Sequence, residues 1–441
     1  MFKILNTHFI LFFFVFVISA EGVSGPQVGP SPTQADSQIP GAIGFSEAYK
    51  EILSRSLRVE SQRLSTEAFQ ERKNLRIGAF LPSVSAQAVD SQGNLLPGIS
   101  TYAATLNASV NIFRTGGDIA GLQASKRDLA SSREKLRFER QGTEDDAIVA
   151  LTNVIAKSQT SKIEAKFVEI REESVRIARE RFQRGMLAQQ EVSKVLIELE
   201  NARARLADAL TQEADVRAQL KALLGHDLVA LNWPWRDVLA RKSPIEDAPF
   251  DLDLRPDWRA SRLTVEAERL RQRQSFSSLL PSLDLTASYG SLDLSVPGRR
   301  DWSGVLTLSV PLFDGLVSLT NYRLQKITEQ LAEVNSESIR RTAPAAVESL
   351  RLAYKTTKDS AIDREKTAQL AERLYTDNFQ RFRLGRVTAN DLAIDQDRLL
   401  QSQLLAINGW LNAHSAYSRL CHGLGRYVDA NGGCVAEVSG L

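Results

Sequence analysis

Two stretches of the chain decide its fold: Arg181-Phe-Gln-Arg-Gly185-Met-Leu-Ala-Gln-Gln-Glu191-Val192 and, 200 residues later, Arg381-Phe-Arg-Leu-Gly385-Arg-Val-Thr-Ala-Asn-Asp391-Leu392. They share the Arg-Phe pair, the glycine, an acidic residue and the apolar residue that follows it. Glycine tolerates the left-handed backbone with which many helices end. Each stretch therefore predicts a sharp turn between two helices, and the recurrence predicts a duplicated chain.

Two further matches support the duplication. Ala108–Phe113 resembles Leu308–Phe313 at the same offset, and Leu81–Ser83 matches Leu280–Ser282 at an offset of 199. We expect a first repeat over residues 44–225 and a second over residues 256–425. Residues 226–255, which contain Trp233-Pro234-Trp235, are expected to be a linker, and residues 426–441 a C-terminal tail.

Both repeats are expected to contain a very long helix. Gly117–Arg184 and Gly315–Leu384 each cover nearly 70 residues, with one interruption in each, at Gly142-Thr143 and at Thr342-Ala343-Pro344. Pro344 is predicted to kink the helix or to begin a new one. At about 1.5 Å per residue such a helix is on the order of 100 Å long, which a globular domain does not need.

The returning helix of the first repeat has the spacing of a coiled coil. Its apolar residues follow one another at intervals of three, four and seven; they are Val192, Leu196, Leu199, Leu206 and Leu210. The predicted fold class is mainly α with a small β part, built from duplicated long helical hairpins.

Two strand-like runs precede each long helix. From Thr101 to Ile112, apolar and polar residues alternate almost strictly, as in a strand with one apolar and one polar face. The runs have about 8–12 residues, the length of a tilted strand that crosses a bilayer, although a half-buried sheet of a soluble domain has the same pattern. Membrane barrels need at least about eight strands, so four membrane strands require several copies of the chain.

The N-terminus has the pattern of an export signal. Lys3 precedes an apolar run from Phe9 to Ile18, and the small residues Ser19-Ala20 follow. The run is shorter than the roughly 20 residues of a spanning helix. We expect residues 1–20 to be a signal peptide, with a membrane anchor as the alternative, and residues 21–43 to be a flexible segment with several Pro, Gly and Ser.

The composition excludes several classes of protein. Lys and Arg number 55 against 53 Asp and Glu, so the chain lacks the basic excess of a nucleic-acid-binding protein. It contains no nucleophile motif and no phosphate-binding loop, and we expect no catalytic, cofactor or metal site. Cys421 and Cys434 are thirteen residues apart, and a disulfide, a metal site and two free thiols all stay open for them.

In these features the chain resembles the TolC family of outer-membrane efflux proteins from roughly Phe45 to Gly425. The resemblance rests on the duplicated order, on Leu280-Pro281 before a strand pair, on Val310-Pro-Leu-Phe-Asp-Gly315 and on the two Arg-Phe-x-x-Gly turns. It implies a homotrimer in the outer membrane of a Gram-negative bacterium. Each copy would give four transmembrane strands to a twelve-stranded barrel, and its helices would form a coiled-coil tunnel in the periplasm.

The resemblance also implies a function. Such a channel is the exit duct of a tripartite efflux system or of type I secretion, and it opens by an iris-like movement of its helical hairpins. Its partners would be a periplasmic adaptor, an inner-membrane pump and outer-membrane lipid, with no nucleic acid and no cofactor. The rival hypothesis is a periplasmic coiled-coil adaptor or scaffold, which would have a single hairpin or lack the amphipathic strands.

The family pattern assigns roles at the turns. It implies that adaptors grip the hairpin tips, here Arg184, Gly185, Leu384, Gly385 and Arg386. Asp391 matches the acid that lines the entrance on the inner hairpin, and Glu191 takes the equivalent place on the outer one. Family members often carry a second acid three residues on, where this chain has Ile394; Asp395 follows, about one helical turn from Asp391, and is included in the predicted gate.

Overall fold

The computed structural model describes residues 45–92, 100–226, 245–291, 301–429 and 433–435. The predicted signal peptide and flexible segment, most of the predicted linker and most of the C-terminal tail lie outside the described residues. The domain boundaries expected from the sequence therefore stay a prediction.

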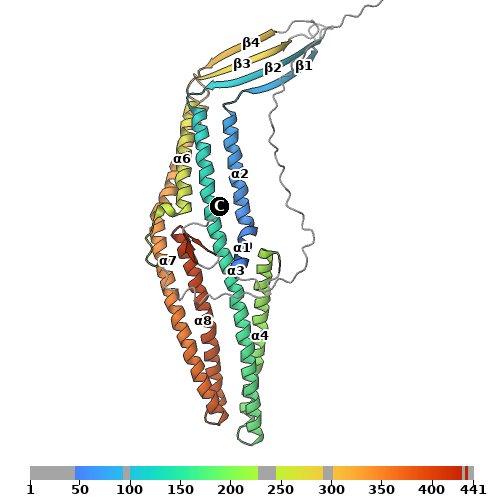
Figure 1. The fold of residues 1–441 in the computed structure, drawn as a ribbon, viewed down its shortest axis with the longest axis vertical. Helices are drawn as coiled ribbons and strands as arrows, with labels where there is room; N and C mark the ends of the chain where they lie inside the picture. Colours follow the sequence, from blue (N-terminus) through green and yellow to red (C-terminus); the bar gives the residue numbers. More distant parts are fainter. Residues whose placement is uncertain (1–44, 93–99, 227–244, 292–300, 430–432, 436–441) are drawn as a thin grey trace, which may run out of the picture. The chain divides into compact units, whose positions relative to one another are not determined.

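One order of elements occurs twice along the chain (Figure 1). The first half contains α1 (Phe45–Arg55), α2 (Leu57–Gly78), β1 (Ser83–Gln92), β2 (Ser100–Phe113), α3 (Gly117–Gln183) and α4 (Gln189–Leu224). The second contains η1 (Leu252–Leu254), α6 (Pro256–Ser277), β3 (Ser282–Ser291), β4 (Asp301–Ser309), α7 (Val317–Arg383) and α8 (Ala389–Gly423), followed by β5 (Tyr427–Val428) and β6 (Cys434–Val435). The prediction of a mainly helical chain with a small sheet is confirmed.

The long helices α3 and α7 each run for 67 residues without a break. The interruptions predicted at Gly142 and Pro344 therefore do not end a helix. A side chain at Gly142 would meet the Arg58 guanidinium at 2.9 Å, so the glycine makes room for a neighbouring helix. Beside Pro344, Ala343 and Val347 are almost fully buried, and this packing offsets the backbone hydrogen bond that proline cannot make.

The apolar spacing of Phe45, Ala48, Ile52 and Val59 predicts one helix from Phe45 to Ala79. The structure has two helices in this segment, α1 and α2. The break is at Ser56, whose backbone is extended and whose hydroxyl accepts a hydrogen bond of 3.4 Å from the Val59 amide. Serine at this position satisfies an amide that the start of a helix leaves unpaired. The sequence-based prediction missed this cap because the apolar spacing continues across it.

The four strands form one antiparallel sheet in the order β1-β2-β3-β4. The pairing of β2 with β3 joins the two halves of the chain. One face carries polar pairs between neighbouring strands: the hydroxyls of Ser83 and Ser109 are 2.7 Å apart, and Asn111 donates to Asp284 at 2.6 Å. Several apolar residues lie opposite apolar residues of the next strand, as Leu285 lies opposite Leu306, although Val305 lies opposite Thr286. The predicted strands with one apolar and one polar face are largely present.

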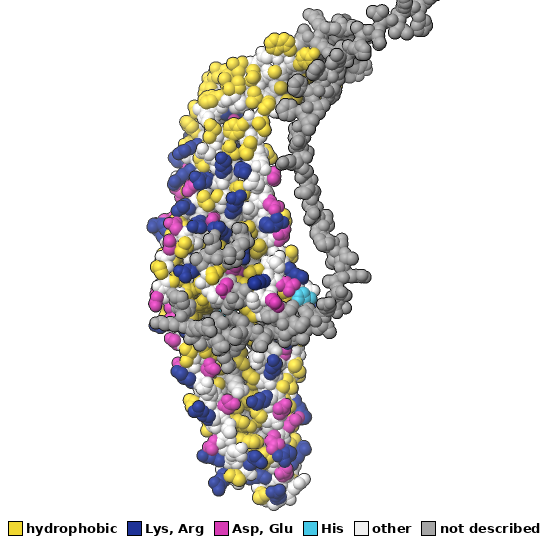
Figure 2. Space-filling view, in the orientation of Figure 1, with side chains coloured by type: hydrophobic (Ala, Val, Ile, Leu, Met, Phe, Trp, Pro, Cys, Tyr) yellow, Lys and Arg dark blue, Asp and Glu magenta, His cyan; other side chains and the backbone are white. Residues whose placement is uncertain are grey.

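Charged side chains become sparse at the sheet. Figure 2 shows apolar side chains gathered over the strands, whereas Lys, Arg, Asp and Glu are spread over the helices. Several large apolar side chains of this region are well exposed in the single chain, among them Val84, Trp302, Leu306 and Leu308. None of the described helices is long and apolar enough to span a membrane.

Helix α3 is the centre of the helical part. It contacts α1, α2, α4, α6 and α8, whereas α7 packs on α6 and α8. The largest apolar cluster gathers residues of five helices and of the C-terminal segment, including Tyr49, Leu151, Tyr354, Trp410 and Val428. Its position fixes how the two long hairpins, α3–α4 and α7–α8, lie beside each other.

The C-terminal segment is tied to this cluster. Cys421 and Cys434 form a disulfide with an S–S distance of 2.06 Å, so of the three alternatives left by the sequence the structure contains the first. Tyr49 donates a hydrogen bond of 2.9 Å to the carbonyl of Val428. The ring of His422 lies between Glu144, at 2.9 Å, and Asp145, at 3.0 Å.

Candidate functional site

The two hairpin turns share one backbone geometry. Gly185 and Gly385 have positive φ angles of 71° and 76°. After each glycine, an amide reaches back into the last helical turn: Met186 N donates to Arg181 O, and Arg386 N to Arg381 O, both at 2.9 Å. This pattern closes a helix whose last carbonyls would otherwise stay unpaired. The predicted tip residues Arg184, Gly185, Leu384, Gly385 and Arg386 are all exposed.

The two tips of one chain lie close together. The guanidinium of Arg181 is 5.6 Å from the centre of the Phe382 ring, a cation–π contact between the hairpins. A side chain at Gly385 would begin 3.2 Å from the Arg181 guanidinium, whereas one at Gly185 would enter open space. Arg181 of the first hairpin therefore packs against the second tip, whereas the backbone at Gly185 faces open space.

Asp391 is exposed and belongs to the first turn of α8. Its amide donates to the hydroxyl of Thr388 at 3.1 Å, and the same hydroxyl lies 2.7 Å from a carboxylate oxygen of Asp391. These two contacts cap the start of α8, and they explain why Thr388 is followed three residues later by an acidic residue. Glu191 lies in the first turn of α4, where the N-cap residue Ala188 offers no side-chain hydrogen bond. The Glu191 carboxylate pairs with Lys194 at 2.8 Å.

Asp395 differs from the other two predicted gate acids. It is only 7% exposed. Its carboxylate accepts hydrogen bonds from Asn378 of α7 at 2.6 Å and from Arg398 at 2.8 Å. In the single chain this carboxylate therefore bonds within the α7–α8 hairpin, and its place in the predicted gate stays a prediction.

Sequence reasoning missed a buried arginine between the hairpins. Arg171 of α3 is 2% exposed. One of its terminal nitrogens lies 2.8 Å from Asp397 of α8 and 3.8 Å from Glu198 of α4. Nearby, Gln396 donates to the hydroxyl of Ser174 at 3.1 Å. Because α3 is rich in charged residues along its whole length, no pattern in the sequence marks Arg171 as buried.

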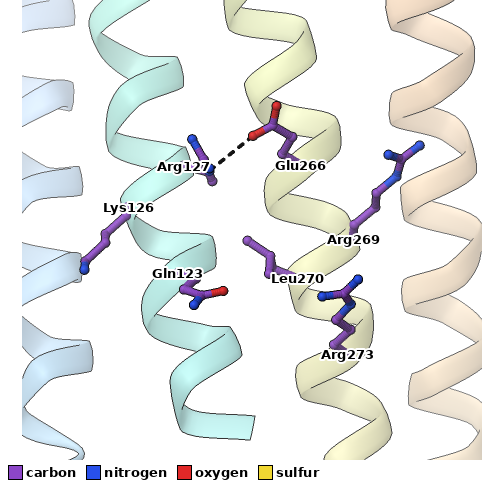
Figure 3. A pocket seen from close by; sticks show the side chains of 7 residues that line it. All are labelled: Gln123, Lys126, Arg127, Glu266, Arg269, Leu270 and Arg273. Carbon is purple, nitrogen blue, oxygen red and sulfur yellow. Dashed lines mark ion pairs between the residues drawn. The ribbon is translucent and has the colours of Figure 1, made fainter. Parts of the chain in front are cut away.

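A hollow lies between α3 and α6 (Figure 3). It has a volume of about 600 Å³ and a basic rim. Arg127 points across it to Glu266 at 3.1 Å, while Arg269 points away toward α7, where it pairs with Glu329 at 3.2 Å. The cations named here are thus paired and solvent-facing, as on an ordinary charged helix surface. Within the described ranges, no group of His, Cys, Asp or Glu could hold a metal ion.

Comparison with known proteins identifies the fold. Residues 48–226 and 252–426 match the family described as "Outer membrane efflux protein". The chain belongs to the outer membrane efflux protein family. Members of this family are passive channels, so the protein is a transport channel of the outer membrane of Gram-negative bacteria and not an enzyme. The rival hypothesis of a periplasmic adaptor or scaffold is not supported.

Individual relatives agree with this family. The outer membrane efflux protein BepC of Brucella suis biovar 1 is 23% identical over 320 residues, which cover 68% of this chain and 67% of BepC. The CmeC outer membrane channel of Campylobacter jejuni has a TM-score of 0.75 at 18% identity, over 90% of this chain and 87% of CmeC. The open state of the MtrE channel of Neisseria gonorrhoeae gives 0.73 at 20% identity, over 89% and 91% of the two chains.

Proposed function

We propose that three copies of the chain form the exit duct of a tripartite efflux system. The observation that carries this proposal is that the described sheet has two open edges. In the described sheet, β1 and β4 each pair on one side only. Unpaired strand edges are costly in lipid, so a second copy must cover them. Efflux is favoured over type I secretion because BepC is an efflux protein by name.

The helices below the strands have matching edges. Helix α2 has no buried residue, and it exposes Leu57, Leu64 and Leu75. Helix α7 exposes an apolar stripe at intervals of three and four residues, the spacing of a coiled-coil seam; it consists of Leu324, Ile327, Leu331 and Val334. The β4–α7 edge of one copy would meet the β1–α2 edge of the next, and such a head-to-tail contact closes into a ring. Three copies give twelve strands, with the polar face inside.

This association is tested with one substitution on the stripe. Leu331→Glu should lower the fraction of trimer in detergent, because it places a charge in the apolar seam. Lys326→Glu, on an exposed position of the same helix, is the matched control and should leave the trimer intact. Light scattering coupled to size exclusion measures both. A trimer fraction in Leu331→Glu equal to that of the unmodified chain would exclude the proposed edge.

The gate is proposed at the hairpin tips. Glu191 and Asp391 occupy the starts of the returning helices and would form acidic rings at the periplasmic mouth, where rings of acids select cations. Asp395 would contribute by holding α8 to α7. Separation of the hairpins, an iris-like movement, would open the mouth.

Planar-bilayer recordings test the gate. The double variant Glu191→Gln, Asp391→Asn should lose cation preference, so that the permeability ratio of cation to anion falls toward unity. Glu200→Gln with Asp363→Asn removes one exposed acid from each hairpin away from the tips and should change the ratio less. Equal ratios in the unmodified chain and the first variant would contradict the proposed mouth.

The exposed tips are proposed to bind a periplasmic adaptor that connects the channel to an inner-membrane pump. Leu384, 69% exposed at the second tip, offers an apolar contact next to Gly385. Gly385→Glu should abolish adaptor-dependent efflux in cells and leave trimers intact. Gly315→Glu is the control: Gly315 also has a positive φ, and a side chain there would enter open space away from the tips. Normal efflux in Gly385→Glu would remove the tip from the docking site.

A further inference from the structure

The four helix ends that adjoin the strands are strongly basic. The eleven residues of each helix nearest the strands together hold ten Lys and Arg against three Asp and Glu; they are residues 68–78, 117–127, 267–277 and 317–327, here called the basic zone. The helix ends at the hairpin tips hold eight of each in the same length; they are residues 173–183, 189–199, 373–383 and 389–399. Since the whole chain has a net charge of only +2, its positive charge is concentrated beside the sheet.

The helix dipole does not account for this excess. It favours cations only in the last turn of a helix and disfavours them in the first turn. Helices α3 and α7 present their first turns to the strands, yet the first eleven residues of α7 contain Arg323 and Lys326 and no acid. An anion outside the helices is a reason for cations that applies at all four ends.

A groove between α3 and α6 connects the basic zone to the strands. One part is the hollow of Figure 3, which has Lys126 on its α3 side and Arg273 on its α6 side. Both side chains are exposed, and no carboxylate of the described residues pairs with either. The other part, a hollow of about 570 Å³, shares Arg273 and is lined near the strands by Ile119, Phe276 and Tyr322.

The aromatic residues of this groove mark the level at which the apolar strands begin. The ring centres of Phe276 and Tyr322 are 5.7 Å apart, and Phe276 is exposed. Near the opposite ends of the strands, Tyr289 lies opposite Trp302, and both are exposed. Aromatic residues at both limits of an apolar band are typical of barrels in the outer membrane.

The aromatic part of the groove lies on the side of the apolar face of the sheet. Gln274, about 200° from Phe276 around α6, lines a different hollow together with Ser282 and Ser309. These two serines lie opposite each other on the polar face of β3 and β4. Figure 2 shows basic side chains directly below the apolar side chains of the strands.

We propose that the basic zone binds the headgroups of anionic phospholipids in the periplasmic leaflet of the membrane. Along its helix, Arg273 is about 5 Å from Phe276, and Lys126 is about 10 Å from Ile119. The headgroup layer is about 5–8 Å thick on each side of the hydrocarbon core. Lys126 and Arg273 therefore lie at the level of the phosphates of lipids whose chains cover Ile119 and Phe276. Cations at this level attract anionic lipids.

The groove stays accessible in the proposed trimer. Helices α3 and α6 contact each other in the middle of the order α2, α3, α6, α7. A neighbouring copy meets α2 and α7, so it does not cover the groove between α3 and α6. The lipid is therefore the partner that this part of the basic zone can bind.

Lipid retention by the unmodified full chain in detergent tests the proposal. The protein is incubated with equal amounts of anionic phosphatidylglycerol and zwitterionic phosphatidylcholine that have the same acyl chains. It is then isolated by affinity purification, and retained lipid is quantified by mass spectrometry. Phosphatidylglycerol should be retained in at least about tenfold excess at about 0.1 M salt. The excess should fall at about 1 M salt, where the screening length is about 3 Å. A ratio near one at low salt would overturn the proposal.

Two double variants locate the binding. Lys126→Gln with Arg273→Gln should lower the excess at least about threefold, because both cations of the groove are lost. Lys162→Gln with Arg179→Gln is the matched control: it removes two exposed cations of α3 that lie nearer the tip, and it should leave the excess unchanged. An unchanged excess in the first variant, or an equal loss in both, would contradict a site in the groove.

Inorganic phosphate distinguishes a lipid from a free anion. Replacement of chloride by phosphate at equal ionic strength should leave the excess of phosphatidylglycerol unchanged, since the acyl chains contribute to binding. Displacement of the lipid would instead assign the cations to free phosphate and refute the lipid assignment.

The inference rests on the proposed function, because it requires strands that cross the membrane. The trimer fraction and the bilayer conductance of the same preparations report the channel separately. A conducting trimer without a preference for phosphatidylglycerol would overturn the lipid site alone. Absence of trimers in the unmodified chain would overturn the proposed function.

Discussion

The two hairpins are built from one sequence template but are buried differently. In the first, the long helix α3 holds most of the buried residues and the short helix α4 few; in the second, the long helix α7 is mostly exposed and the short helix α8 is buried. The repeated Arg-Phe pair shows the contrast best. Phe182 is 42% exposed, whereas Phe382 is fully buried.

The difference follows from position and not from the template. Helices α3 and α8 form the contact between the two hairpins. Helix α4 therefore lies on the outer side of the first hairpin, and α7 on the outer side of the second. Phe382 lies in a cluster with Val175, Ala178 and Leu392, which belong to both hairpins. When the two halves of a duplicated chain pack side by side, a repeated residue can be buried in one half and exposed in the other.

The largest expected effect comes from shortening the two phenylalanines. Phe382→Ala should lower the free energy of unfolding by about 3–5 kcal/mol, because it leaves a cavity in the shared cluster. Phe182→Ala, the matched change in the other repeat, should cost less than about 1.5 kcal/mol because the ring is already partly solvated. Chemical unfolding followed by circular dichroism measures both. Equal losses would mean that a second copy of the chain buries Phe182 and would remove the asymmetry.

The C-terminal ends of the short helices should differ in their response to pH. Burial alone would favour a neutral His422, but the neighbouring carboxylates of Asp145 and Glu144 outweigh it and raise the pKa of His422 to about 9. Since the folded pKa is the higher one, the stabilisation is complete below about pH 6.5 and is lost as the pH rises through 9. His422→Gln should therefore cost about 1–3 kcal/mol at pH 6 and less at pH 10.

The end of α4 provides the control. There Arg55 of α1 donates to the carbonyl of Leu224, the last residue of α4. Arginine stays charged throughout this range, so Arg55→Gln should cost the same at pH 6 and pH 10. Thermal unfolding at both pH values compares the variants. A pH-independent loss in His422→Gln would show that the ring acts through packing alone.

The smallest effect is expected at the starts of the short helices. Thr388→Ala should lower stability by about 1 kcal/mol, because the cap of α8 is lost. Ala188→Ser should raise it by about 0.5–1 kcal/mol, since Ala188 already has the extended backbone of a cap without an oxygen to use it. The unfolding midpoint reports both changes. A gain at Thr388→Ala, or a loss at Ala188→Ser, would contradict this difference between the tips.

Much of the fold was predictable because it depends on local patterns. The offset of 200 residues predicted the duplicated order, alternation predicted the four strands, and glycine predicted the turns at Gly185 and Gly385. The sequence did not predict the break at Ser56, and the interruptions predicted at Gly142 and Pro344 do not end α3 or α7. In each of these cases a tertiary or capping contact outweighs the local signal.

The candidate site was less predictable. Asp391 is exposed as expected, but Asp395, four residues later, bonds to Asn378 of the neighbouring helix. Arg171 became notable only because Asp397 and Glu198, which lie far along the chain, meet it in the packed hairpins. The roles of the tip residues and of the acids stay predictions that the experiments above address.

The sequence by itself determined which segments are helices, strands and turns, because backbone preference and the spacing of apolar residues act over a few residues. Only the tertiary structure decided which copy of each repeated feature is buried, which acids are satisfied and where a cavity remains. These properties depend on contacts between segments about 200 residues apart. The two repeats have the same local sequence patterns, so these patterns do not distinguish one copy from the other.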